Sequence, residues 1–215
     1  MLGVRNSSVF LPNCNIWVEG ISDVMYFRDY LDIYQEFKLK EDTNFKKFRE
    51  DLHYSFYKYD GSDINNLLGL ELDDTDKRLE RLYLIRDWDD PKDKKKKVKD
   101  NALKKLLKDK FCLLGRREIE NLIDQPVLLK ILENDKRFRN IDIEDFEYDD
   151  YKTIKLNEFI NDICNNELKE KFIGKSGKMS FHKRTQNYIN NWDDLSPEAQ
   201  EITEMIYNFI KENNF

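Results

Sequence analysis

Glycine and proline, the residues that most often interrupt helices and strands, are scarce in this chain: there are 7 and 4 of them among 215 residues. Charged residues make up 37% of the chain and the mean hydropathy is -0.80, values close to those of disordered proteins. Aromatic residues nevertheless make up 13%. A chain with this many aromatic residues and so few glycines and prolines is expected to fold, so disorder is excluded as its main state.

Cysteine and histidine are also rare, with 3 and 2 residues. Cys14, Cys112 and Cys164 are odd in number, lie far apart and form no CxxC pair. They therefore predict neither a disulfide framework nor a zinc site, and the two histidines do not change this. We expect three buried thiols.

Long apolar runs are absent as well. No segment approaches the roughly 18 apolar residues of a membrane span. Residues 1–12 contain neither a basic n-region nor a long apolar h-region. We therefore expect a cytoplasmic protein with no membrane partner, large enough at 26.1 kDa for one domain with a modest appendage.

The charge is unevenly distributed. With 37 Lys and Arg against 43 Asp and Glu, the net charge is -6, which on average repels nucleic acid. Residues 92–110, however, contain 10 Lys against 3 Asp, whereas residues 142–150 contain six acids and no base. The lysine run is either a solvated helix face or a patch that binds a phosphate backbone, and the sequence leaves both open.

Short apolar segments alternate with helical patterns over the first 124 residues. Strands are expected at residues 15–18, 54–59, 82–86 and 111–114, and helices at 23–34, 44–51, 65–70, after residue 91, and at 116–122. Such alternation predicts an α/β fold with a mainly parallel four-stranded sheet and flanking helices. Ligands bind such sheets at the carboxyl ends of the strands.

Strand signals fade beyond residue 124. Helical patterns remain at residues 126–134, 156–171 and 197–212. In the last of these, Ser196 can cap the helix and Pro197 suits its first turn, while an apolar stripe predicts a core-facing side. We therefore divide the chain into an α/β core at 1–124 and a helical extension of the same domain at 125–215.

Acidic residues follow two of the predicted strands. Glu19 ends the first strand and Asp23 lies one helical turn later, while Asp87 and Asp89 follow the third strand. Neighbouring strand ends are about 5 Å apart, so we expect these acids to converge. Carboxylates that close repel one another unless a cation neutralises them, and oxygen-only ligands favour Mg²⁺ or Mn²⁺. One or two such ions predict phosphodiester hydrolysis by a metal-bound water.

Three motifs, in this order, resemble the Toprim domain, a Rossmann-like fold shared by topoisomerases, bacterial primases, recombination proteins and the OLD (overcoming lysogenization defect) nucleases. They are VEGISD at residues 18–23, DWD at 87–89 and IEN at 119–121. The segments IWVEGISDVMYFRDYL at 16–31, YDGS at 59–62 and RREIENL at 116–122 are most similar to the OLD version. The resemblance covers residues 14–122, and makes residues 1–124 the expected Toprim catalytic core.

The resemblance implies a set of site residues. The metal ligands would be Glu19, Asp23, Asp87, Asp89 and Glu120, and a late lysine would assist at the scissile phosphate. Two lysines are candidates for that role, and we favour Lys178 over Lys175. Read alone, Glu120 is more simply a surface acid that pairs with a neighbouring arginine, Arg116 or Arg117.

We therefore expect a metal-dependent DNA endonuclease or nickase that acts as the effector of an ATPase-regulated anti-phage defence system. The DNA backbone would lie along Lys94, Lys95, Lys96, Lys97 and Lys175. OLD proteins usually carry an ATPase upstream, but this chain has no Walker A motif, and its residues 6–11 resemble the end of that ATPase. An ABC/OLD-type ATPase subunit encoded separately is thus the expected partner, unless the chain is a fragment.

Two alternatives use the same residues differently. A topoisomerase or primase module would share the acids. Strand passage by a topoisomerase also needs a catalytic tyrosine, and Tyr83 and Tyr26 are the candidates for it. A non-catalytic Toprim-like module would dock on a partner ATPase and use its acids for assembly. The sequence also leaves open DNA against RNA, nicking against double-strand cleavage, and homo- against hetero-oligomer.

Overall fold

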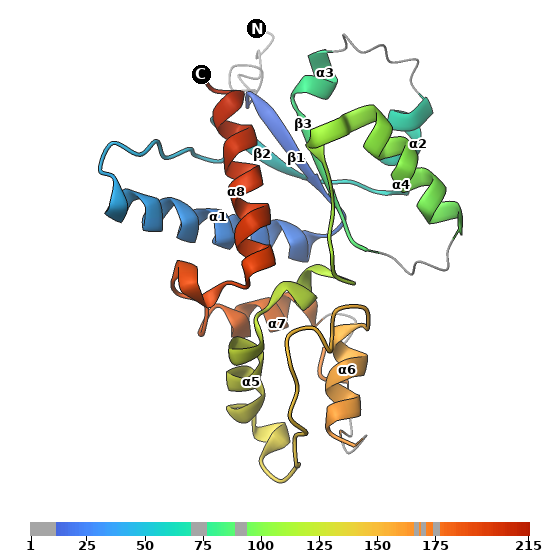
Figure 1. The fold of residues 1–215 in the computed structure, drawn as a ribbon, viewed down its shortest axis with the longest axis vertical. Helices are drawn as coiled ribbons and strands as arrows, with labels where there is room; N and C mark the ends of the chain where they lie inside the picture. The colour runs from blue at the N-terminus through green and yellow to red at the C-terminus, as the bar shows by residue number, and fades with distance from the viewer. Residues whose placement is uncertain (1–11, 70–76, 89–93, 166–167, 169–170, 174–176) are drawn as a thin grey trace, which may run out of the picture.

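The computed structural model describes residues 12–69, 77–88, 94–165, 168, 171–173 and 177–215, and its centre is a parallel sheet (Figure 1). The four strands are β1 (Cys14–Val18), β2 (Tyr54–Lys58), β3 (Leu82–Arg86) and β4 (Phe111–Leu113). Their order is β2-β1-β3-β4, and all three pairings are parallel. The predicted α/β class with a four-stranded parallel sheet is confirmed, and the arrangement is Rossmann-like.

The strands form at short, mostly apolar segments, and burial alternates along β1 but not along β3. In β1, Cys14, Ile16 and Val18 are fully buried on one face. Every residue of β3 is buried, because this central strand is covered on both faces. Ile16 lies opposite Phe56 of β2 and Tyr83 of β3, so side chains of three strands form one layer of the core.

Helices cover both faces of the sheet. On one face lie α1 (Ile21–Glu41) and α8 (Pro197–Glu212), which contact each other and share the larger apolar core. The other face is covered by α2 (Gly61–Gly69), α3 (Lys77–Glu80) and α4 (Lys94–Leu107) around a smaller core (Figure 1). The predicted core stripe of α8 is confirmed, and its Phe209 ring lies 5.2 Å from that of Tyr83.

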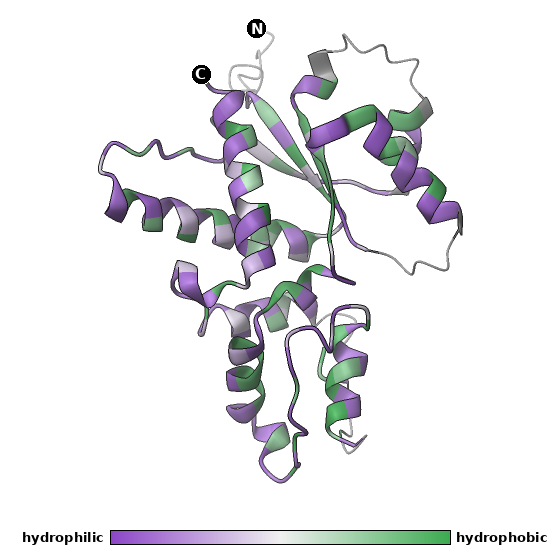
Figure 2. Cartoon of the chain, in the orientation of Figure 1, coloured by the Kyte–Doolittle hydropathy of each residue, from purple (hydrophilic) through white to green (hydrophobic). Residues whose placement is uncertain are grey.

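Helices α5 (Gln125–Glu133), α6 (Leu156–Ile163) and α7 (Lys178–Thr185) form the lower part of the molecule in Figure 1. Figure 2 shows green and purple residues along both α6 and α8, the pattern of amphipathic helices. Short 3-10 helices lie at Lys108–Lys110, Ile119–Leu122, Lys136–Phe138 and Trp192–Asp194. Among the described helices, none combines the length and apolar composition that crossing a bilayer requires.

The three cysteines are free and buried, as predicted. Burial raises the pKa of Cys14 and of Cys112 to about 12. These thiols therefore stay protonated and pack as small apolar side chains.

Three predicted helices are wrong or shortened. The helix predicted at 156–171 ends at Ile163, the last residue of α6. Residues 44–51 form no helix; α1 instead extends to Glu41 and a loop follows. Tertiary contacts hold this loop, since the Phe48 amide donates to Gln35 Oε1 at 2.6 Å and Tyr207 of α8 donates to the Lys46 carbonyl. The helix predicted at 116–122 is reduced to the 3-10 turn Ile119–Leu122.

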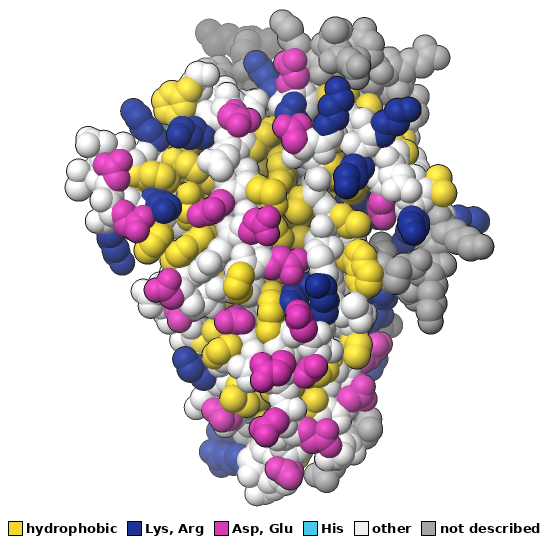
Figure 3. Space-filling view, in the orientation of Figure 1, with side chains coloured by type: hydrophobic (Ala, Val, Ile, Leu, Met, Phe, Trp, Pro, Cys, Tyr) yellow, Lys and Arg dark blue, Asp and Glu magenta, His cyan; other side chains and the backbone are white. Residues whose placement is uncertain are grey.

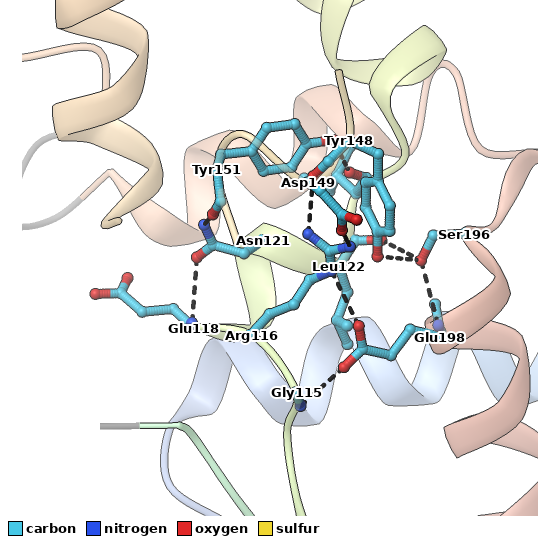
Figure 4. Close-up of polar contacts among 12 residues, drawn as sticks. Gly115, Arg116, Glu118, Asn121, Leu122, Tyr148, Asp149, Tyr151, Ser196 and Glu198 are labelled. Atoms are coloured by element: carbon cyan, nitrogen blue, oxygen red, sulfur yellow. Dashed lines mark hydrogen bonds and ion pairs between the residues drawn. The ribbon is translucent and has the colours of Figure 1, made fainter. Parts of the chain in front are cut away.

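Arg116 connects the segment after β4 to the helical part of the chain (Figure 4). Its side chain is only 3% exposed and donates to Glu198 Oε2 at 3.0 Å, the Tyr148 carbonyl at 2.8 Å and Asp149 Oδ1 at 2.8 Å. The guanidinium also lies 3.3 Å from the centre of the Tyr148 ring. Three segments distant in sequence thus meet at one buried cation.

Gly115 allows this junction to close. Its amide donates to Glu198 Oε1 at 2.8 Å. A Cβ atom at this position would lie 2.5 Å from the same oxygen, so any side chain would displace the Glu198 carboxylate.

Replacement of Arg116 by Ala should lower the free energy of unfolding by about 3 kcal/mol, because it removes the donor to Glu198 Oε2 and to the partly buried Tyr148 carbonyl. Urea denaturation measures this change. Arg139→Ala is the matched control: Arg139 is exposed, and its loss should change the value by less than about 0.5 kcal/mol. Equal effects of the two variants would contradict the assigned role of Arg116.

Candidate functional site

An open cavity of about 400 Å³ lies at the carboxyl ends of the strands, and we call it the strand-end pocket. It is formed by the turn after β1, the first turn of α1, the end of β2, the residue after β3 and the start of α7. Its lining residues are Glu19, Gly20, Ile21, Ser22, Asp23, Lys58, Asp87, Lys178 and Met179. The fold thus brings together four of the predicted site residues from three distant segments: Glu19 and Asp23, Asp87, and Lys178.

Glu19 follows β1 and is held through one carboxylate oxygen. Its Oε1 accepts hydrogen bonds from the Tyr59 hydroxyl at 3.1 Å and from Arg86 Nε at 3.4 Å. Burial raises the pKa of Tyr59, and the charge of Glu19 raises it further, so the phenol remains a neutral donor. Sequence analysis missed both partners of Glu19.

Asp23 is the third residue of α1 and caps the start of that helix. Its Oδ2 accepts from the Gly20 amide at 3.0 Å and its Oδ1 from the Ser22 hydroxyl at 3.1 Å. A Cβ on Gly20 would lie 3.2 Å from Asp23 Oδ1, so glycine makes room for this carboxylate. Burial raises the pKa of Asp23, although both hydrogen bonds oppose the shift.

Asp87 follows β3 and faces several like charges. Burial is the first cause that raises its pKa well above the ordinary value, and the charges of Asp23, Glu19 and Glu120 raise it further. Lys178 acts in the opposite direction. Three of the other predicted acids thus lie close enough to act electrostatically on Asp87. Asp89, the second acid of the DWD motif, lies outside the described residues.

Glu120 lies in the 3-10 turn Ile119–Leu122, and only 1% of its side chain is exposed. Lys178 Nζ donates to Glu120 Oε2 and to Glu118 Oε2, both at 2.9 Å. The surface pairing of Glu120 with Arg116 or Arg117 is therefore wrong. Glu118 is a site residue that sequence analysis missed, since the three-residue motif that carried the resemblance began one position later.

Burial shifts the pKa values of Lys178 and Glu120 in opposite directions. Burial lowers the pKa of Lys178, but Glu120 and Glu118 outweigh it, so the net shift is upward and the ammonium stays charged. Burial raises the pKa of Glu120 despite Lys178. The other oxygen of Glu120, Oε1, is buried and has no hydrogen-bond partner in the described structure.

These residues suit a divalent ion by the type of their donor atoms but not by their arrangement in the described structure. Within the described part of the chain, no group of three or more Asp, Glu, His or Cys side chains is arranged to hold one. The donor chemistry nevertheless fits Mg²⁺ or Mn²⁺, because the available ligands are carboxylate oxygens. A cation here would also satisfy Glu120 Oε1 and relieve the repulsion that raises the pKa of Asp87.

The lysines predicted to contact nucleic acid fall on α4. Lys95, Lys96 and Lys97 are exposed, whereas Lys175 and the side chain of Lys94 lie outside the described residues. Figure 3 shows dark blue side chains over α4 and magenta acids concentrated over the lower part of the molecule. The basic helix and the acidic segment 142–150 thus occupy different parts of the surface.

Comparison of the chain with protein-family models, curated proteins and solved structures finds no match in any of the three.

The raised pKa of Asp87 predicts how stability depends on pH. The unfolded chain releases this proton near its ordinary pKa of about 4, whereas the folded chain releases it only at higher pH. In metal-free buffer the free energy of unfolding should therefore fall as pH rises from that value through the raised pKa. Asp87→Asn should flatten this decrease and stabilise the protein at pH 8 by on the order of 1 kcal/mol.

Urea denaturation from pH 4 to pH 8 tests this expectation. Asp145→Asn removes an exposed carboxylate from the acidic segment and serves as the control. Parallel pH curves for wild type and Asp87→Asn would contradict the assigned electrostatics.

Proposed function

We propose that this chain is a metal-dependent DNA endonuclease or nickase of the Toprim type, similar to the OLD-family nucleases. One observation carries the proposal: acids from two separate segments, Glu19 with Asp23 and Asp87, line one pocket together with Lys178 at the carboxyl ends of a parallel sheet. This is the place where an α/β sheet binds its ligands. The residues are also those that the motif resemblance selects.

In this proposal Glu19, Asp23, Asp87, Asp89 and Glu120 hold one or two Mg²⁺ or Mn²⁺ ions. A bound ion supplies an activated water and neutralises charge on the scissile phosphate. The protein contributes the orientation of the ligands: Asp23 is fixed by the start of α1, and Glu120 by its bond to Lys178.

Lys178 would assist at the phosphate. It stays charged because two carboxylates flank it, and its side chain is 42% exposed at the strand-end pocket. A cation in that position stabilises the negative charge that develops on the phosphate oxygens. We assign Lys178 this role rather than Lys175.

The partners follow from charge and from the resemblance. The exposed lysines of α4 would hold the DNA backbone, since the rest of the chain is acidic overall. The resemblance to OLD proteins further suggests regulation by a separate ABC/OLD-type ATPase within an anti-phage defence system.

A non-catalytic interaction module is the second candidate. The observation that favours it is the ion pair of Lys178 with Glu118 and Glu120, which neutralises part of the acidic cluster without a metal. A topoisomerase reading is disfavoured, because Tyr26 and Tyr83 are 1% and 3% exposed and pack in the core, where neither can attack a DNA strand.

Plasmid nicking with Mg²⁺ or Mn²⁺ tests the proposal. Wild type should convert supercoiled plasmid to the open-circular form, and Glu19→Gln or Asp87→Asn should reduce the rate by about 100-fold or more, because each variant removes a charged ligand. The assay is run with and without the neighbouring ATPase.

Glu133→Gln and Asp145→Asn are the matched controls, since both residues are exposed and lie away from the strand-end pocket. They should nick at the wild-type rate. If Mn²⁺ neither supports nicking nor raises the melting temperature of wild type, the interaction module is the correct function.

Replacement of Lys95, Lys96 and Lys97 by Gln should weaken DNA binding and make it less dependent on salt. Each lost phosphate contact lowers the slope of log K against log salt by about 0.9, so the slope should fall by up to about 3. Fluorescence anisotropy of labelled duplex DNA at several salt concentrations measures it. A matched triple variant replaces exposed cations of the lower part: Lys130, Lys136 and Arg139. If log K depends on log salt with the same slope in both triple variants, α4 is excluded as the DNA-binding surface.

A further inference from the structure

Among the described residues, hydrogen bonds hold only one of the two carboxylate oxygens of Glu19. Oε1 accepts from both Tyr59 and Arg86, whereas Oε2 takes part in no hydrogen bond among the described residues. The Glu19 side chain is 30% exposed and lines the strand-end pocket. One oxygen is thus anchored to the fold, and the other remains available for a ligand.

Both donors are themselves fixed. The Tyr59 hydroxyl also lies 3.4 Å from the Ile85 carbonyl, which places it between β1 and β3. The Arg86 side chain is 7% exposed, and its Nη1 donates to Asp100 Oδ1 at 2.6 Å. Burying a guanidinium is costly unless charged partners surround it, so the ion pair with Asp100 helps to fix the position of Arg86.

Asp100 belongs to α4, the lysine-rich helix. A chain of contacts therefore runs from Asp100 through Arg86 to Glu19, with distances of 2.6 Å and 3.4 Å. It joins the exposed basic helix to the first acid of the strand-end pocket.

We infer that Tyr59, Arg86 and Asp100 are positioning residues that present Glu19 to a divalent cation, so that the position of α4 determines how well the pocket binds metal. The inference rests on the proposed function and adds a link between the DNA-facing helix and the metal ligands. None of the three residues is among those that line the strand-end pocket. Their loss should weaken metal binding more than it slows the reaction at saturating metal.

The experiment measures nicking and melting temperature across a Mn²⁺ titration for Tyr59→Phe and Asp100→Asn. Each variant removes one hydrogen-bonding or charged group and keeps the size of the side chain. Matched controls are Tyr57→Phe on β2, two residues before Tyr59, and Asp109→Asn in the 3-10 turn that follows α4; both residues are exposed.

Tyr59→Phe and Asp100→Asn should each raise the Mn²⁺ concentration for half-maximal nicking by about 10-fold, as expected for groups that orient a metal ligand. The rate at saturating Mn²⁺ should change less. Each should also require more Mn²⁺ to reach the same rise in melting temperature. The controls should match wild type in both readouts.

Two results would overturn the inference while leaving the proposed function intact. One is a metal titration in which the two variants behave like their controls. The other is an equal loss of activity at all Mn²⁺ concentrations together with lower stability, which would give these contacts a purely structural role. If wild type neither nicks nor responds to Mn²⁺, the proposed function fails, and the inference fails with it.

Discussion

The buried guanidinium of Arg116 determines how the helical half of the chain meets the sheet. It pairs with Glu198 at the start of α8 and with the 148–149 loop, and its own backbone leads directly into the turn that carries Glu118 and Glu120. Because a buried cation must keep its partners, this junction fixes three segments at once. Glu118 and Glu120 are therefore held where both can accept a hydrogen bond from Lys178, which lines the strand-end pocket.

Repulsion among carboxylates is the second constraint. It works against the close approach of segments that the Arg116 junction enforces. Asp23, Asp87 and Glu120 all have raised pKa values because the fold buries them near one another, and Lys178 compensates only in part. Ordinary packing would not select such a cluster. Its persistence at a strand-end pocket is the pattern expected of a binding site, where stability is given up for chemistry.

The sequence predicted the strands to within one residue at either end, because each is a short apolar run bounded by turn residues. It also placed Glu19, Asp23, Asp87 and Lys178 in one site. Residues 44–51 do not form the predicted helix, because contacts with Gln35 and with Tyr207, which lies far along the chain, hold them as a loop. No local sequence pattern reveals such contacts. Arg86 and Glu118 were missed for the same reason, since their partners are 67 and 60 residues away.

The placement of α7 and α8 has a consequence for how the protein is made. Lys178 comes from the last quarter of the chain, and α8 covers the same sheet face as α1. While the ribosome is still translating, the emerging N-terminal half has an uncovered sheet and an acidic cluster without its lysine. The strand-end pocket is thus completed only after α7, which carries Lys178, has been synthesised.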